Sequence, residues 1–288
     1  MIPASFDYAA PSNLEEVIAL LQAHRGARVL AGGQDLLTQM KLRHAAPPML
    51  IDLRAVRGLR GITTVSNPDT LQIGAMTTCT DIALHPEVRA HAAALAEAAD
   101  SIGDMQVRNA STIGGNLAYG DPAADLPAAL LALDAAILTQ GAHGPRNIPA
   151  DQFFVGSFRT VLDSDEVITA VHIPLQKIGH HSAYEKFKNP ANGYPIVGVA
   201  ASLVLREGGS IVSCRLGVTG SEAHPQRLYQ AEDALKGKRA SAAAFAAAVS
   251  QGIASLKGRT DLYASGEYRV HLATILAADG SQIYPNTH

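Results

Sequence analysis

The first 57 residues alternate between helical and strand-like spacing of their apolar positions. Residues 14–21 repeat at helical intervals, whereas 27–31 and 49–53 are short apolar runs with the length of buried strands. Between these two runs, residues 34–43 return to helical spacing and end before a Pro-Pro pair. The order helix, strand, glycine turn, helix, strand predicts a small α/β unit over residues 1–57.

The pattern changes after this unit, because short strands then alternate with helices. Residues 58–176 are expected to form a mixed α+β unit, with strands at 59–65, 70–73, 136–139 and 167–173 and helices at 80–86, 90–102 and 124–134. Residues 177–288 are expected to form a third unit, with strands at 182–188, 196–206 and 211–219 and helices at 228–236 and 241–256. The predicted fold is therefore α+β, with two units followed by a three-stranded sheet with helices.

Composition and charge exclude several classes of protein. Hydrophobic residues make up 47% and charged residues 17% of the chain, as in folded domains, and the net charge of −3 lacks the basic excess of a nucleic-acid binder. Two cysteines, Cys79 and Cys214, are too few for an iron–sulfur cluster, which needs about four ligands. The histidines show no metal-ligand spacing. No stretch resembles a membrane span or a signal peptide, so we expect a cytoplasmic protein.

Two glycine pairs are the strongest chemical signal. Gly32-Gly33 lies where a predicted strand turns into a helix, so its backbone can adopt positive φ and present N–H groups to a phosphate. A single pair of this kind is more often a plain tight turn. A second polar segment, 106–116, contains Gly114-Gly115 and is expected to be another loop, and two such loops could hold a pyrophosphate from two sides. Neither matches G-x-G-x-x-G or the P-loop.

Three runs carry a specific resemblance: AGGQDLL at 31–37, QVRNASTIGGN at 106–116 and GDPAAD at 120–125. They resemble the FAD-binding medium subunit of molybdenum hydroxylases, the family of the carbon-monoxide dehydrogenase medium chain and the xanthine dehydrogenase flavin domain. The resemblance covers nearly the whole chain, because further segments match in the same order at 6–11, 51–53, 73–78, 173–174, 184–188 and 267–269. It implies that the two N-terminal units form a two-part FAD-binding domain. Ser111 stands where many relatives have glycine, so that turn must accept a side chain.

The resemblance also implies which residues hold FAD between the first two units. Thr112 and Asn116 would bond the phosphates and Asp125 the ribose or ribityl side. Ile168, Lys186 and Tyr194 would lie near the flavin ring system. From the residues alone, Asp125 could equally cap a helix, Lys186 could be a solvated strand charge, and Tyr194 could pack locally. The full set of expected contact residues is Val29, Leu30, Ala31, Gly32, Gly33, Gln34, Asp35, Leu36, Ile102, Val107, Thr112, Gly114, Gly115, Asn116, Asp125, Ile168, Lys186 and Tyr194.

By the same resemblance, the chain is the flavin subunit of a molybdenum hydroxylase. Electrons would come from [2Fe–2S] clusters on a small partner subunit, the molybdenum cofactor would be held by a large partner subunit, and the assembly would be a dimer of heterotrimers. The alternatives are a stand-alone flavin oxidase of the vanillyl-alcohol type and a scaffold without FAD. A segment near the C-terminus, with Tyr263, Tyr268, Leu272 and Ile275 at near-helical spacing, could either dock a partner or complete a helix bundle.

Overall fold

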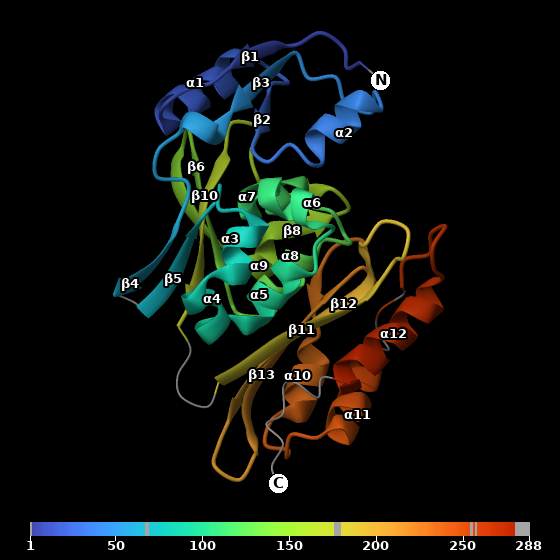
Figure 1. The fold of residues 1–288 in the computed structure, drawn as a ribbon. Coiled ribbons are helices and arrows are strands. Elements are labelled where there is room, and N and C mark those ends of the chain that lie inside the picture. The colour runs from blue at the N-terminus through green and yellow to red at the C-terminus, as the bar shows by residue number, and fades with distance from the viewer. Residues whose placement is uncertain (1, 67–68, 176–179, 254–255, 257, 280–288) are drawn as a thin grey trace.

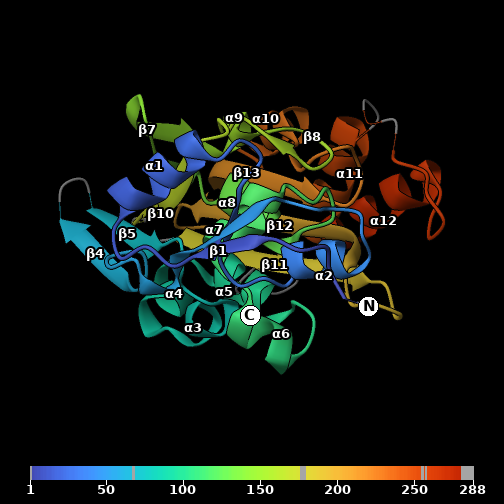
Figure 2. The same cartoon turned by 90° about the horizontal axis from the view of Figure 1, so that it is seen from above.

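The computed structural model describes residues 2–66, 69–175, 180–253, 256 and 258–279, and within them three sheets of three, five and four strands form the framework. The elements follow one another along the chain from the N-terminal lobe, through the middle, to the C-terminal sheet and its helices (Figure 1). A view from above shows the C-terminal helices α11 and α12 at one side and β4 at the other (Figure 2). The predicted α+β class is confirmed, whereas the boundary proposed at 176/177 lies outside the described residues.

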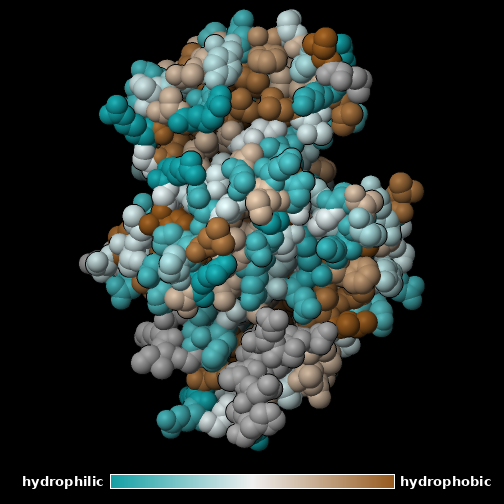
Figure 3. All heavy atoms as spheres, viewed as in Figure 1, coloured by the Kyte–Doolittle hydropathy of each residue, from teal (hydrophilic) through white to brown (hydrophobic). Residues whose placement is uncertain are grey.

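The N-terminal unit is a small parallel α/β lobe, separated from the body by a narrow waist in the space-filling view (Figure 3). Its strands run in the order β1-β3-β2. The first helix begins where expected because the side chain of the N-cap residue Asn13 accepts from Glu16 N, while the Glu16 carboxylate accepts from Ser12 N, one residue before the position it would have in a capping box. The elements are β1 (Asp7–Ala9), α1 (Leu14–Ala23), β2 (Arg28–Leu30), α2 (Leu36–Lys41), β3 (Met49–Asp52) and a 3₁₀ turn at Leu53–Ala55.

The middle unit is an antiparallel sheet in the order β4-β5-β10-β6-β7, with helices over it. The strands are β4 (Ile62–Ser66), β5 (Asp69–Gly74), β6 (Ala136–Gly141), β7 (Gly144–Pro149), β10 (Val167–Pro174) and the short pair β8 (Phe154–Gly156) and β9 (Arg159–Thr160). The helices are α3 (Cys79–Leu84), α4 (Pro86–His91), α5 (Ala93–Asp100), α6 (Met105–Ala110), α7 (Ile113–Tyr119), α8 (Asp125–Ala132) and α9 (Ala150–Phe153).

Several elements of the middle unit differ from the sequence expectation, among them one divided helix and one missed edge strand. The helix predicted over 90–102 is two helices, because the chain turns at Ala92. Strand β7 was missed because it contains two prolines and lacks an alternating apolar pattern, which an edge strand can tolerate.

The C-terminal unit is a sheet of four described strands, not three, in the order β11-β12-β13-β14. The added strand, β14, has two residues and leaves no sequence pattern. The elements are β11 (His180–Lys188), β12 (Pro195–Leu205), β13 (Ile211–Thr219), β14 (Gln226–Arg227), α10 (Tyr229–Leu235), α11 (Ala242–Ile253) and α12 (Gly266–Asp279). None of the described helices has the length and apolar character needed to cross a bilayer.

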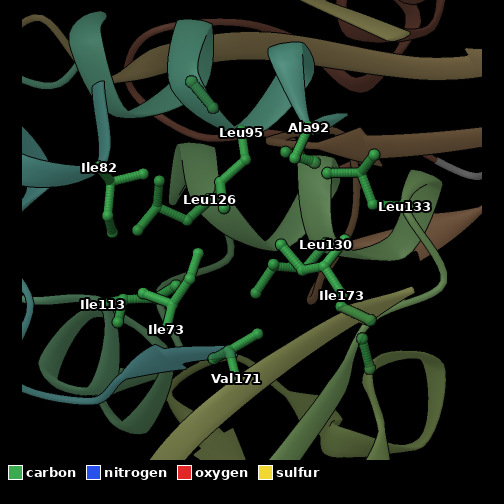
Figure 4. Close-up of a cluster of buried hydrophobic side chains, with 14 of the residues drawn as sticks. Ile73, Ile82, Ala92, Leu95, Ile113, Leu126, Leu130, Leu133, Val171 and Ile173 are labelled. Carbon is green, nitrogen blue, oxygen red and sulfur yellow. The ribbon is translucent and has the colours of Figure 1, made fainter. Parts of the chain in front are cut away.

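The largest buried cluster joins the middle unit to the C-terminal sheet. Figure 4 shows its centre, where Leu126 and Leu130 of α8 meet Ile73, Val171 and other side chains of the middle sheet. The same cluster includes Tyr184 of β11 and Ala200 of β12. Helix α8 therefore lies between the middle sheet and the C-terminal sheet.

Candidate functional site

A cleft of about 580 Å³ lies between the N-terminal lobe and the middle unit, and both glycine segments line it. Its walls combine apolar side chains near β2 and β10 with polar groups near α2 and α7. Twelve of the expected contact residues line it, namely Val29, Ala31, Gly32, Gly33, Gln34, Asp35, Leu36, Thr112, Gly114, Gly115, Asn116 and Ile168.

The first glycine segment is a loop, as expected. Strand β2 ends at Leu30, Gly33 adopts φ = 73°, and α2 begins at Leu36. Within the described part of the chain, the main-chain N–H groups of residues 32–35 donate no hydrogen bond to protein. Four neighbouring N–H groups without a partner at the edge of a cleft are donors for an external acceptor, since main-chain donors are almost always paired in folded proteins.

The second glycine pair does not lie in a loop, so that prediction was wrong. Residues 105–110 form α6, and Gly114 and Gly115 occupy the first turn of α7. The Asp104 carboxylate caps α6 and the Thr112 hydroxyl caps α7. Ser111, at the junction, has φ = −62°, a conformation open to any residue, which explains why a serine fits there.

The first-turn N–H groups of α7 are already bonded to protein. Ile113 N donates to Thr77 O, Gly114 N to Ala75 O, and Gly115 N to the Thr112 hydroxyl. These backbone donors are therefore not available to a phosphate, in contrast to those of residues 32–35.

The glycines allow the two segments to approach closely. A Cβ on Gly32 would lie 2.1 Å from the carbonyl oxygen of Ala110, and a Cβ on Gly114 would lie 2.7 Å from Ala75 Cβ. Both distances are well inside van der Waals contact. A side chain on Gly32 would therefore push the loop away from α6, and a side chain on Gly114 would push α7 away from the chain after β5. What α7 presents to the cleft is side chains: Asn116 Oδ1 is buried without a hydrogen-bond partner.

Six expected contact residues do not line this cleft: Leu30, Ile102, Val107, Asp125, Lys186 and Tyr194. Asp125 and Lys186 instead form a buried ion pair, with 2.9 Å between Lys186 Nζ and Asp125 Oδ1. The same carboxylate accepts from the hydroxyl of Tyr184 at 2.7 Å. Burial raises the pKa of Asp125, and the neighbouring ammonium group opposes this effect.

The geometry decides the three alternatives left open by the sequence. Asp125 is not a helix cap, because Ala124 occupies that position without a side-chain bond. Lys186 is not a solvated strand charge: its side chain is 6% exposed, and its ammonium group also donates to the carbonyls of Ser101 and Gly193. Tyr194 does more than pack locally, because its hydroxyl donates to Asp35 of the first glycine segment at 3.4 Å.

Two carboxyl groups, Asp35 and Asp121, interact near one end of the cleft. Burial raises the pKa of Asp35, and the nearby Asp121 carboxylate raises it further. Burial also raises the pKa of Asp121.

Two guanidinium groups, Arg28 and Arg159, line the cleft and form no ion pair with another described residue. They are positive charges that a bound pyrophosphate could neutralise.

Sequence reasoning missed several lining residues. Tyr119 and Phe158 form an edge-to-face pair with ring centroids 5.2 Å apart, and Gln39 donates to the Tyr119 hydroxyl. Phe158 has φ = 55° in the turn between β8 and β9. These residues come from three separate elements and share no local motif, so only the folded chain brings them together.

Comparisons with known proteins agree with this architecture. The model of the FAD binding domain in molybdopterin dehydrogenase matches residues 4–176, and that of the CO dehydrogenase flavoprotein C-terminal domain matches residues 182–281. The chain therefore belongs to the family of FAD-binding medium subunits of molybdenum hydroxylases, and FAD is its cofactor.

Individual relatives match over nearly their full length. The chain is 39% identical over 275 residues to the carbon monoxide dehydrogenase medium chain of Hydrogenophaga pseudoflava, covering 95% of this chain and 94% of that one. It is 38% identical to the nicotine 6-hydroxylase medium subunit of Paenarthrobacter nicotinovorans, covering 91% of each. The solved carbon monoxide dehydrogenase from Hydrogenophaga pseudoflava superimposes with a TM-score of 0.92 over 96% of both chains. Family membership favours a flavoprotein subunit over a stand-alone oxidase.

Proposed function

We propose that the cleft between the N-terminal lobe and the middle unit holds the pyrophosphate of FAD against the main-chain N–H groups of residues 32–35. The observation that carries this proposal is the run of four N–H groups without a protein partner beside the cleft. Asn116 Oδ1 is an additional buried acceptor, suited to a ribose or ribityl hydroxyl. Arg28 and Arg159 would offset the phosphate charge. When bound here, FAD would supply the redox chemistry that links one-electron and two-electron transfer. The protein would bind FAD and orient it.

We assign a second role to the residues around the Asp125–Lys186 pair. They connect the middle unit to the loop that bears Tyr194, and Tyr194 reaches back to Asp35. This chain of contacts holds Tyr194, which the resemblance expects beside the flavin ring system, in position next to the first glycine segment. The three units would be held in one arrangement by buried polar bonds.

The test is the flavin content of the intact complex. We expect the chain, co-expressed with its partner subunits, to carry one non-covalently bound FAD, released by denaturation and identified by chromatography and mass. A complex that assembles without flavin and takes up none when FAD is added would contradict the assignment.

In the proposed assembly, this chain receives electrons from a small [2Fe–2S] subunit and delivers them to an external acceptor, while a large subunit holds the molybdenum cofactor. The support is that the relatives are named as medium chains or subunits of dehydrogenases and hydroxylases. The dimer of heterotrimers and the cytoplasmic location remain predictions.

We place a partner contact on the outer face of α12. Tyr268 and Ile275 are exposed on this helix, whereas Leu272 is buried and completes the local core. Phe187 of β11 packs edge-on against Tyr268, and Leu262 and Tyr263 precede the helix with exposed side chains. Apolar side chains gather on this part of the surface in Figure 3. An exposed apolar patch of this kind is typical of an interface.

The docking proposal is tested by size-exclusion chromatography after co-expression. We expect Tyr268→Asp to release this chain from the complex, and Leu84→Asp, at an exposed leucine of α3, to leave assembly unchanged. Equal assembly of both variants would refute this surface without affecting the FAD assignment.

A further inference from the structure

Arg269 is the largest fully buried side chain of the described residues, and the flavin assignment gives it no role. It lies on α12, and its guanidinium donates to the carbonyl oxygens of Ile196 and Gly220 and to the Asp261 carboxylate. Burying a guanidinium is costly unless its donors are used. Here the Nη1 and Nη2 donors are used and hold together the beginning of β12 and the chain just after β13, whereas Nε has no hydrogen-bond partner among the described residues.

Gly220 is fixed in this position by the same contact. Its φ is 79°, and a Cβ would lie 2.4 Å from the Ile196 carbonyl oxygen. A residue with a side chain would therefore be strained and would collide with backbone. Arg269 and Gly220 together define where β13 ends.

The end of β13 in turn holds a segment of the middle unit. Gly220 N donates to Pro122 O at 2.8 Å, and the Thr219 hydroxyl lies 3.0 Å from Pro122 O and 2.7 Å from Ala124 O. Thr219 is 1% exposed, so water cannot replace these bonds without rearrangement. All three contacts cross from the C-terminal unit to the segment 121–125.

This segment carries two carboxylates that lie outside the cleft and act on groups of the proposed flavin site. Asp121 lies close enough to Asp35 of the first glycine segment to influence its pKa. Asp125 forms the buried ion pair with Lys186, which also bonds the carbonyl of Gly193 beside Tyr194. The position of 121–125 therefore sets the positions of groups on two sides of the site.

We propose that Thr219 and Arg269 are positioning residues for FAD: through Pro122 and Ala124 they fix the carboxylates of segment 121–125 relative to the glycine loop. This inference rests on the proposed FAD site. It makes the C-terminal unit a part of the flavin site through its backbone clamp, in addition to the residues of β11 and its following loop.

The experiment uses the co-expressed complex, stripped of flavin and titrated with FAD by fluorescence quenching. In Thr219→Val, the isosteric side chain lacks the hydroxyl, and we expect FAD to bind about tenfold more weakly, which corresponds to the loss of about 1.4 kcal/mol. We also expect a shift in the absorption bands of the bound flavin. Thr219→Ser restores the hydroxyl and is expected to recover both properties.

Thr274→Val is the matched control, because Thr274 lies on α12 and its hydroxyl donates to the carbonyl of Val270 in its own helix. If the Thr219→Val complex binds FAD with unchanged affinity and an unchanged spectrum, the inference is overturned. The proposed function is judged separately, by whether the wild-type complex binds FAD. An equal loss in Thr274→Val would also overturn the inference, as a general effect of destabilising the unit. If Thr219→Val does not assemble, Arg269→Lys takes its place, and wild-type affinity and spectrum in that variant would overturn the inference.

Discussion

The two glycine pairs look alike in sequence but do different work in the fold. At Gly32-Gly33, the chain is a loop whose N–H groups have no partner among the described residues. At Gly114-Gly115, the chain is the first turn of α7, and its N–H groups bond Ala75 and Thr112. The comparison teaches that a glycine pair can serve either to expose backbone donors or to let two backbones touch. These two roles are distinguished by whether the N–H groups of the glycine pair already bond protein acceptors.

The largest effect is expected from Gly32→Val. Its Cβ would overlap the Ala110 carbonyl oxygen and separate the loop from α6, so the row of N–H groups would lose its position. We expect FAD affinity to fall by about 100-fold or more, since several bonds to a charged group are lost together. Flavin content and thermal unfolding of the complex should be measured together. Gly156→Val is the control, because its nearest neighbour would be 4.0 Å away. Full FAD occupancy in Gly32→Val would contradict the claim that the first glycine pair serves to present N–H donors to FAD.

Gly114→Ala should affect folding first. The added methyl group would meet Ala75 Cβ at 2.7 Å and the Ala75 carbonyl oxygen at 2.9 Å. We expect the free energy of unfolding to decrease by about 1–3 kcal/mol, the usual cost of overpacking. Denaturant unfolding of the variant, with and without FAD, measures this decrease. Loss of FAD with no loss of stability would show that this glycine acts on the ligand, contrary to the comparison.

The difference between the two pairs also shows what the sequence could and could not predict. The first loop was predicted because a short apolar run, two glycines and a helical pattern follow one another within ten residues. The second was misassigned because polar residues and glycines have low helix propensity, although Asp104 and Thr112 were available as N-cap residues. Tertiary contacts to Thr77 and Ala75 stabilise that turn.

Long-range pairing set the limit for the rest of the site. Asp125 and Lys186 were both selected through family resemblance, yet nothing local indicates that these two residues, 61 positions apart in the chain, bind each other. The same holds for the clamp between Thr219 and Pro122. Elements with periodic patterns could be predicted, whereas buried polar pairs between distant segments required the fold.

Asn116→Ala tests the role of α7 in this comparison, because it removes a side chain whose Oδ1 has no partner in the part of the chain that the structure describes. We expect about tenfold weaker FAD binding and little change in stability, since no internal bond to this oxygen is lost. Flavin titration and thermal unfolding give the two quantities. Asn109→Ala is a suitable control, because Asn109 bonds the Thr80 hydroxyl instead. Unchanged affinity in Asn116→Ala would leave α7 with a purely structural role.

The smallest effect is expected at the acidic end of the first loop. The pKa of Asp35 is raised by burial and by Asp121, so its ionised form is disfavoured in the folded chain. An acid with a raised folded pKa destabilises the fold at neutral pH, and this penalty disappears as pH falls through the folded pKa towards the ordinary value of about 3.8. Asp35→Asn should therefore stabilise the protein by less than about 1 kcal/mol at pH 7 and by progressively less in acid.

The same variant should bind FAD a few-fold more tightly, because one negative charge near the pyrophosphate is removed. Three other titratable side chains face the Asp35 carboxylate, namely Asp121, Tyr119 and Tyr194. The control for a general effect of removing one negative charge is Asp69→Asn, at the start of β5 and away from these groups. Weaker FAD binding in Asp35→Asn would mean that this carboxylate binds the ligand directly, and the first loop would then act through a side chain as well as through its backbone.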